Sequence, residues 1–534
     1  MKRIGRSWIA ALVLACACGG NGGTGGDAGP DGDAAGEVAD VAIADEDSDP
    51  AADEPGSSDL TGETGEVVQE APVQAGVGMA NIDPDFEPFT DTNDNHVWDP
   101  GEPFVDRNDN KRLDTLWIGG FGVRQPTGTH DPLTARAVAL RLHGETYVFA
   151  ALDTLGFGMK RVVAVKERVV AALGATAIDP DRLFIASIHT HQAPDTIGVF
   201  APDSQAGWDE AYLQHVVDGA VSSILAAVGD LRPAHLRVAN ADGTGLVRDI
   251  RSPEILDPYI GILQAVDATS GTPIATMATI SNHPEAAWGD NTLISADFPY
   301  YLRTKLEADL GGMAVYLSAD QGLMQTPTEI APEGFERAQA IGEAYATRIA
   351  AALATAATLP DTDVAPTFGM AATTVPLENF GLAALVLADI ADGYRDYVYQ
   401  EDTGPCSEMG CMDLPHPVLR LGDRLTILCV PAEVTPELVI GGIAAPTEYA
   451  SQFPDAPPEP IVADHLATPD RFFIGLCGSD VGYLYPKITT NLDAVYDQQN
   501  GPGPGCAGVF LAGLEALLDQ VNGQAGARAE EGTR

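Results

Sequence analysis

The chain is poor in basic residues, and none occurs between Arg6 and Arg107. Lys and Arg together number 29 against 77 Asp and Glu, which gives a formal net charge of −48 at pH 7. A surface of this sign repels phosphate backbones, so the composition argues against a nucleic-acid partner. The same surface attracts Ca²⁺, a hard cation that prefers oxygen ligands.

Long apolar runs are lacking too: after the N-terminal region, no segment reaches the ~20 apolar residues that a membrane-spanning helix needs. The N-terminus has a basic start and a short apolar run at 8–15, the order typical of a secretory signal peptide. The ending VLAC (13–16) resembles a bacterial lipoprotein signal, in which Cys16 would be lipidated, with Cys18 as a second candidate. We therefore predict a lipid-anchored protein of the outer membrane or cell surface; a plain secretory peptide is the alternative.

Bulky side chains are rare from residue 19 to about 74, where Gly, Ala, Asp and Glu dominate. Such a segment cannot bury enough apolar surface to offset its ordering entropy, so we expect a disordered acidic linker after the signal peptide of residues 1–18. The remainder, 75–534, is long enough for a large core and is expected to be the folded catalytic domain.

Cysteine is scarce as well, with seven residues in the chain. Beyond Cys16 and Cys18, the remaining cysteines are Cys406, Cys411, Cys429, Cys477 and Cys506. An exported protein tolerates disulfides, and Cys406 and Cys411 bracket a small polar loop, so we predict a bridge between them. The odd number left after the signal implies at least one free thiol.

An internal repeat stands near the start of the predicted domain, as DTNDNHVWD (91–99) and DRNDNKRLD (106–114). Oxygen-bearing side chains recur at the alternate positions of an EF-hand-type calcium loop, with His96 in place of the turn glycine. The second copy has Trp117 where the loop's last glutamate belongs, and a polar Asx-turn loop without an ion is the alternative. The predicted calcium ligands are Asp91, Asn93, Asn95, Asp99, Glu102, Asp106, Asn108, Asn110 and Asp114.

Strand-like and helix-like segments alternate over the rest of the chain, which predicts an α/β domain with a mixed sheet. We expect a hairpin at 137–153, strands at 183–188, 260–267, 273–281, 313–318, 424–431 and 472–477, and helices at 160–173, 209–228, 298–310 and 335–356. Polar side chains follow four of these apolar runs: His189, His283, Glu433 and Tyr483. Ligand sites in α/β folds favour such strand ends.

Each of these residues has an ordinary structural explanation when it is considered alone. His189 and His191 point to the same side of an extended chain, but two hydrogen-bonded structural histidines fit that pattern as well as a site does. His283 also suits a turn, and Glu433 suits the first turn of a helix, where the dipole favours a carboxylate. Their order along the chain is more informative.

The motifs HTH (189–191), NHP (282–284), PAE (431–433) and GY (482–483) resemble, in that order, the neutral ceramidase family of zinc amidases. Further segments are similar to the family's: GVGMANIDP (76–84), GTHDPLTARAVAL (128–140), DIRSP (249–253) and ISADFP (294–299). The resemblance runs from about residue 76 to about 500. It implies an N-terminal zinc-amidase domain of the ceramidase type.

The resemblance also implies roles for individual residues. His189, His283, Glu433 and Tyr483 match the family's zinc ligands. His191 matches the histidine that acts on the amide, and Tyr496 matches a tyrosine that hydrogen-bonds the developing oxyanion. Arg251 would anchor a substrate oxygen.

The implied activity is hydrolysis of the amide bond of a ceramide-like N-acyl lipid by zinc-activated water. Gln192 and Ala193 depart from the family's Ser-Gly after HTH, so another amide or an ester also fits. Too few residues follow Tyr483 for the family's immunoglobulin-like domain, which we expect to be absent. The alternative from another class is a calcium-stabilised surface lipoprotein that binds a partner without catalysis.

Overall fold

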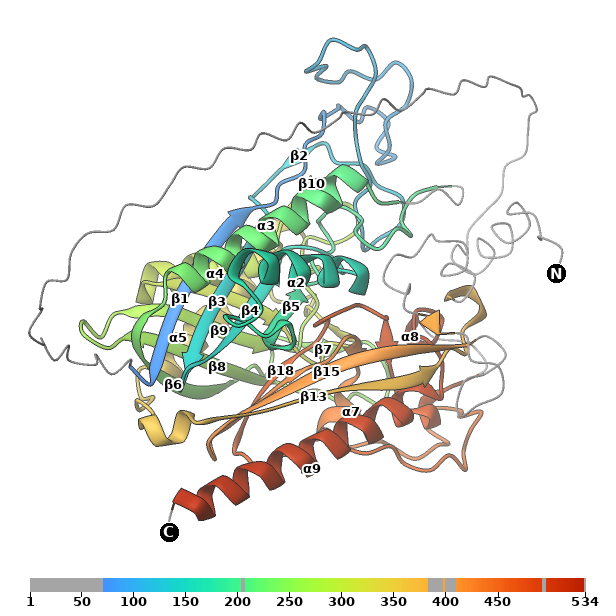
Figure 1. The fold of residues 1–534 in the computed structure, drawn as a ribbon. Helices are drawn as coiled ribbons and strands as arrows, with labels where there is room; N and C mark the ends of the chain where they lie inside the picture. Colours follow the sequence, from blue (N-terminus) through green and yellow to red (C-terminus); the bar gives the residue numbers. More distant parts are fainter. Residues whose placement is uncertain (1–70, 203–206, 383–396, 399–409, 492–495, 533–534) are drawn as a thin grey trace, which may run out of the picture. The chain divides into compact units, whose positions relative to one another are not determined.

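A computed structural model describes residues 71–202, 207–382, 397–398, 410–491 and 496–532 (Figure 1). The strands are β1 (Val73–Asn81), β2 (Gly128–Thr129), β3 (Thr134–Leu142), β4 (Glu145–Leu152), β5 (Leu183–Ser187), β6 (Arg232–Asp242), β7 (Arg248–Asp249), β8 (Tyr259–Asp267), β9 (Pro273–Ile280), β10 (Leu293–Ile294), β11 (Met313–Ser318), β12 (Met324–Gln325), β13 (Pro366–Pro376), β14 (Tyr397–Val398), β15 (Cys411–Leu421), β16 (Leu425–Cys429), β17 (Glu433–Val434), β18 (Asp470–Ile474) and β19 (Tyr483–Leu484). The helices are α2 (Met159–Leu173), α3 (Glu210–Gly229), α4 (Phe298–Leu310), α5 (Phe335–Leu353), α7 (Pro436–Ile440), α8 (Tyr496–Gln499) and α9 (Cys506–Gly532).

A large mixed sheet of eight strands forms the centre of the fold, in the order β11-β9-β8-β6-β1-β3-β4-β5. β11 runs parallel to β9, and β5 runs parallel to β4, while the neighbours between them are antiparallel. The two edge strands β11 and β5 contact each other, so the sheet bends until its edges meet. The ends of strands from opposite edges therefore come together, which is where the candidate site lies.

A second sheet packs beside the first, with the order β13-β15-β16-β18 and β14 paired to β15. β18 contacts β8, β9 and β11 of the large sheet, and α9 packs along β13 and β15 (Figure 1). The apolar side chains of α9, among them Phe510, Leu514 and Leu517, form a separate core with those of the second sheet. The predicted class, a mixed-sheet α/β fold, is confirmed.

The helices cover the large sheet by close packing of small residues. α3 lies on β1 and β3, and α2 packs against α3. Gly76 and Gly78 of β1 face α3 closely. An added Cβ would come within 2.3 Å of the Ala227 carbonyl oxygen at Gly76, and within 2.1 Å of the Ser223 carbonyl oxygen at Gly78. α3 is long and apolar enough to span a membrane, and 56% of its most apolar window is buried. Its packing identifies it as a core helix.

Most of the predicted elements match the structure closely. The hairpin β3–β4 turns at His143 and Gly144, both with positive φ, as a tight two-residue turn requires. α4 and β11 have the predicted bounds, and the other predicted helices and strands differ by a few residues at their ends. β1 begins at Val73, whereas we expected the folded part from residue 75. Cys16, Cys18 and most of the predicted linker lie outside the described residues.

The sequence analysis predicted β16 and β18 of the second sheet but missed β13, β14, β15 and α9. β15 contains Pro415 and Pro417, which normally argue against a strand because proline cannot donate to a ladder. Both prolines lie where β15 pairs with β13 on one side, before its pairing with β16 begins at Val418. Their missing N–H groups are therefore tolerated there.

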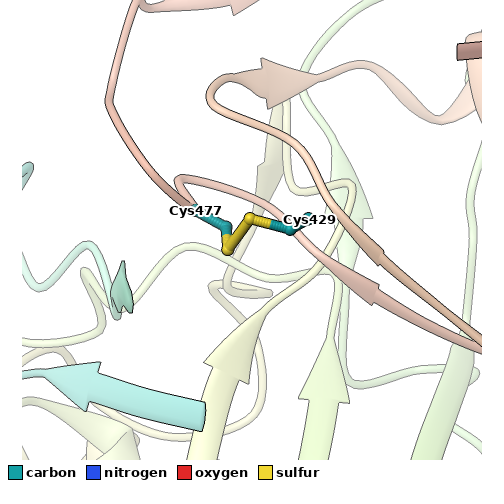
Figure 2. The surroundings of a disulfide bond; sticks show 2 residues. All are labelled: Cys429 and Cys477. Atoms are coloured by element: carbon teal, nitrogen blue, oxygen red, sulfur yellow. A yellow bond between two sulfur atoms is a disulfide. The ribbon is translucent and has the colours of Figure 1, made fainter. Parts of the chain in front are cut away.

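One disulfide joins Cys429 at the end of β16 to Cys477, just beyond β18 (Figure 2). Their Cα atoms lie 5.2 Å apart, because β16 and β18 run parallel with Cys429 opposite Ile474. Cys411 is also disulfide-bonded, while Cys406, its predicted partner, lies outside the described residues. Cys506 is free and buried, in agreement with the expected unpaired thiol.

Candidate metal centre

The first two candidate histidines lie just beyond β5, at the bent edge of the large sheet. The apolar run of β5 is completely buried, and His189 follows it with φ 65°, an uncommon conformation for a side chain of this size. The Nδ1 atom of His189 lies 2.7 Å from the carbonyl oxygen of Leu155. A carbonyl oxygen only accepts, so this nitrogen carries the proton, and Nε2 is left with its lone pair.

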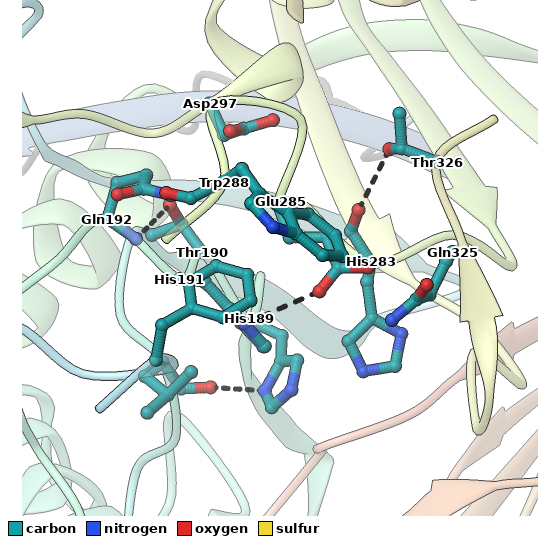
Figure 3. A network of polar contacts seen from close by, with 12 residues as sticks. His189, Thr190, His191, Gln192, His283, Glu285, Trp288, Asp297, Gln325 and Thr326 are labelled. Atoms are coloured by element: carbon teal, nitrogen blue, oxygen red, sulfur yellow. Dashed lines mark hydrogen bonds and ion pairs between the residues drawn. The ribbon is translucent and has the colours of Figure 1, made fainter. Parts of the chain in front are cut away.

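His283 is fixed in the same manner after β9. Its backbone N–H donates to the Met324 carbonyl at 2.9 Å, and its Nδ1 lies 2.8 Å from the same oxygen. The hydroxyl of Thr326, two residues after Met324, donates to the His283 carbonyl (Figure 3). Nε2 of His283 is therefore also the nitrogen that faces the centre. Metal-ligating histidines commonly donate their other ring N–H to such an acceptor.

The predicted carboxylate and tyrosine ligands lie on two short parallel strands that pair with each other. β17 and β19 place Glu433 directly opposite Tyr483 in register. The Glu433 Oε2 atom lies 2.9 Å from Nε2 of His283 and 3.4 Å from Nε2 of His189. The Tyr483 hydroxyl lies 3.2 Å from Nε2 of His283. The structure thus brings the donor atoms of all four predicted ligands together.

These groups are buried, and burial competes with their mutual interactions. Burial lowers the pKa of His189 to about 4, against the charge of Glu433, which raises it. Burial also lowers the pKa of His283, but the hydrogen bond and charge of Glu433 outweigh it and raise that pKa to about 9. Burial raises the pKa of Glu433, yet its partners His189, His283 and Tyr483 lower it overall. In the metal-free protein, a proton on His283 therefore balances the Glu433 carboxylate.

The arrangement fits a metal ion of the zinc type. The Nε2 atom of His189, the Nε2 atom of His283 once its proton is displaced, a carboxylate and a phenol oxygen are hard-to-borderline donors that zinc accepts. A second donor set overlaps the first: ring nitrogens of His189, His191 and His283 lie within 4.8 Å of one another, all buried. The two sets share His189 and His283, so His191 is either a third nitrogen ligand or a neighbouring proton carrier.

His191 is enclosed by a segment that the sequence analysis did not single out. Its backbone N–H donates to the Pro284 carbonyl at 3.0 Å, and the ring of Phe121 meets its ring edge-on at 4.9 Å between centroids. The buried guanidinium of Arg124 donates to the His191 carbonyl and to the Gln192 side chain. Burial, with help from His189, His283 and Arg124, lowers the pKa of His191 well below its usual value. His191 is thus neutral near pH 7.

The two remaining predicted site residues lie on neighbouring elements. Arg251 pairs with the buried carboxylates of Glu437 and Asp497, the latter at 3.7 Å, so its charge is already balanced within the protein. Its Nε and Nη1 atoms are buried without a hydrogen-bond partner among the described residues. Tyr496 begins α8 next to Asp497, but its side chain lies outside the described part.

The two Asx-rich loops have matching backbones. His96 and Lys111, at the loop position that usually holds glycine, have φ of 66° and 63°. Glu102 accepts from the N–H groups of Thr92 and Asp99 in the first loop. Glu87 accepts from the equivalent N–H groups, those of Arg107 and Asp114, in the second. The Glu87 carboxylate, which precedes the repeat in the sequence, therefore takes in the second loop the place that Glu102 has in the first. Trp117 stands at that position in the sequence of the second loop.

Two of the segments that carry the family resemblance contact each other and support the centre. Asp131 of the segment 128–140 accepts from the Ser295 hydroxyl and the Ala296 N–H of the segment 294–299. Asp297 of the latter accepts from the N–H groups of Ala286 and Ala287, and so holds the turn that follows His283. The family resemblance included these two segments, but it did not indicate that their hydrogen bonds support the residues around His283.

A bent mixed sheet with buried histidines at its strand ends, and a glutamate beside them on a separate short strand, defines an α/β protein that could bind a metal ion. Among solved structures, the chain is similar to neutral ceramidase from Pseudomonas aeruginosa, with a TM-score of 0.60 and 16% identity over 85% of this chain and 75% of that one. A ceramidase complexed with C2 gives a TM-score of 0.59 and 16% identity over 86% and 76%. No protein-family model and no curated protein matches the chain. At this identity the similarity establishes the fold.

Proposed function

We propose that the protein is a zinc-dependent amidohydrolase that cleaves the amide bond of a ceramide-like N-acyl lipid. The observation that carries the proposal is the convergence of donor atoms from His189, His283, Glu433 and Tyr483 at strand ends of a ceramidase-like fold. The four residues lie in or just after four different strands, two in the large sheet and two in the short parallel pair.

A zinc ion held by these residues would supply a Lewis acid, which lowers the pKa of water towards about 7 and polarises a carbonyl group. The neutral ring of His191 is able to accept a proton at one nitrogen and return it to the leaving amine. Tyr496, at the start of α8, is proposed to donate to the oxyanion, and the buried N–H groups of Arg251 to a substrate oxygen. The Glu433 carboxylate balances the positive charge of the centre.

The wall beside His191 is formed by Gln192, Phe121 and Trp288. Gln192 is fully buried, and its amide donates to the Trp288 carbonyl while its oxygen accepts from Arg124. The rings of Phe121 and Trp288 pack at 5.2 Å and form an aromatic surface next to His191. An acyl chain suits such a surface. Because Gln192 is occupied by these contacts, we propose that it shapes the wall and does not bind the substrate.

The test is metal analysis combined with lipid hydrolysis on the full-length chain purified in detergent. The proposal expects stoichiometric zinc and release of fatty acid from at least one member of a panel of N-acyl sphingosines, N-acyl amino acids and matched esters. Glu343→Gln, on α5 and hydrogen-bonded to Gln339, is the matched control and should leave both readouts unchanged. Calcium alone, without zinc and without turnover, would favour a binding module.

We also propose that the two Asx-rich loops hold structural Ca²⁺, and that Cys16 anchors the chain to a bacterial outer membrane or cell surface. Support for calcium comes from the equivalent placement of Glu102 and Glu87. Isothermal titration with CaCl₂ should detect two sites, and Glu87→Gln should weaken one while leaving the other intact. Equal effects on both, or none, would contradict this assignment.

A further inference from the structure

The buried carboxyl group of Glu285 is not explained by the proposed chemistry. It lies two residues after His283, and its side chain is almost completely buried. One of its oxygens, Oε1, has no hydrogen-bond partner among the described residues. A buried carboxyl oxygen without a hydrogen-bond partner is unfavourable, so the groups within reach of Glu285 indicate its role.

The nearest partner of Glu285 is His191. The Glu285 Oε2 atom lies 3.6 Å from Nδ1 of His191, and the two side chains face each other in Figure 3. This distance exceeds that of a hydrogen bond, about 2.7–3.2 Å, and catalytic contacts are often long before substrate binds. Both ring nitrogens of His191 otherwise lack hydrogen-bond partners among the described residues. Glu285 is therefore the acceptor in reach of Nδ1.

The backbone holds this pair in place from both sides. The His191 N–H donates to the carbonyl of Pro284, the residue next to Glu285. The turn that carries Glu285 is fixed by Asp297, which accepts from the two following N–H groups. On the other side, Gly120 has φ 93°, and an added Cβ there would come within 2.5 Å of the His191 ring. These contacts fix the backbone of both residues, and Gly120 leaves little space on its side of the His191 ring.

We propose that Glu285 is the positioning residue of His191, an inference that rests on the proposed amidase function. Its carboxylate accepts the Nδ1–H of His191 and so selects the tautomer in which Nε2 has a free lone pair. Nε2 takes a proton from the attacking water and passes it to the leaving amine, while Nδ1 keeps its own proton.

The deciding variant is Glu285→Gln, which keeps the volume of the side chain and removes its charge. Its amide presents either an oxygen or an NH₂ group to Nδ1, so it no longer selects one tautomer. With N-dodecanoyl sphingosine in detergent micelles as the probe, kcat should fall about 10²–10³-fold with little change in KM. Zinc content should stay stoichiometric, because none of the four proposed ligand atoms is altered. Glu285→Asp should recover part of kcat, and Glu343→Gln should match the wild type.

A second readout does not depend on turnover. Nitrogen-15 NMR of the histidine rings, with the His191 signals assigned by their loss in His191→Ala, should show protonated Nδ1 in the zinc-loaded wild type and a mixture of tautomers in Glu285→Gln. If the wild type cleaves no lipid of the panel, the proposed function fails, and this measurement still decides the role of Glu285. An unchanged tautomer would overturn the inference. Loss of zinc in Glu285→Gln would also overturn it, because Glu285 would then belong to the metal centre.

Discussion

The two halves of the candidate metal centre are held by different means. His189 and His283 follow strands of the large sheet, and each ring is fixed by a backbone carbonyl, from Leu155 and Met324. Glu433 and Tyr483 come from a two-residue parallel pair outside both large sheets. Val434 and Leu484 of that pair pack into the core of the second sheet, and the Cys429–Cys477 disulfide joins the segments that lead to it.

The histidine half is built into the core of the large sheet, whereas the carboxylate half stands on two very short strands. β5 and β9 belong to the main hydrophobic core, so a ring at their ends is held by the packing of the whole sheet. β17 and β19 have only two residues each. Perturbations of the second half should therefore alter metal binding before they alter the fold.

The largest effect is expected from removing one ligand in each half. Glu433→Ala and His283→Ala should both lose stoichiometric zinc and lower kcat/KM by at least about 10³-fold, since metal catalysis supplies several kcal/mol. Circular dichroism should show an intact fold in both. Full activity in either variant would remove the basis of the proposed function.

A comparison within the histidine half separates the two donor sets. His189→Ala should lose zinc, because Nε2 of His189 faces Glu433 at 3.4 Å. His191→Ala should keep zinc and lose about 10²–10⁴-fold in kcat, the usual contribution of a proton carrier. Metal analysis of the two purified variants distinguishes them. Zinc lost equally from both would instead favour the three-histidine set.

The next effect concerns the covalent link beside the carboxylate half. The disulfide closes a loop with a sequence separation of 48 residues, so Cys429→Ser with Cys477→Ser should lower the free energy of unfolding by about 2–4 kcal/mol. Urea unfolding measures this change. Zinc affinity should weaken about 10–100-fold, as for other supporting groups. Unchanged zinc affinity would show that β17 and β19 are held without the link.

The smallest effect is a pH dependence that links the halves through His283 and Glu433. The pKa of His283 is raised from 6.5 to about 9, so the metal-free fold gains stability that is fully present below pH 6.5 and is lost as pH rises through 9. Zinc must displace this proton, so its affinity should rise about tenfold per pH unit and level off above 9. Glu433→Gln should shift the plateau to lower pH. Competition with a zinc chelator at several pH values measures the slope.

The sequence predicted the parts of this protein that depend on local pattern. Apolar runs located most strands of the large sheet, and the polar residues at their ends marked His189, His283, Glu433 and Tyr483. It could not predict the Cys429–Cys477 bridge, because that pairing depends on the parallel register of β16 and β18. Glu285 was visible beside NHP, but only the turn held by Asp297 places it against His191.

The backbone carbonyls of Leu155 and Met324 have a consequence for how the sequence can change. They set the proton position on both histidines, and no side-chain substitution at 155 or 324 deletes a carbonyl group. The electronic state of the two ligands is thus encoded in the path of the chain. Sequences that share this path can drift far apart and still present the same two lone pairs, in keeping with a common fold at 16% identity.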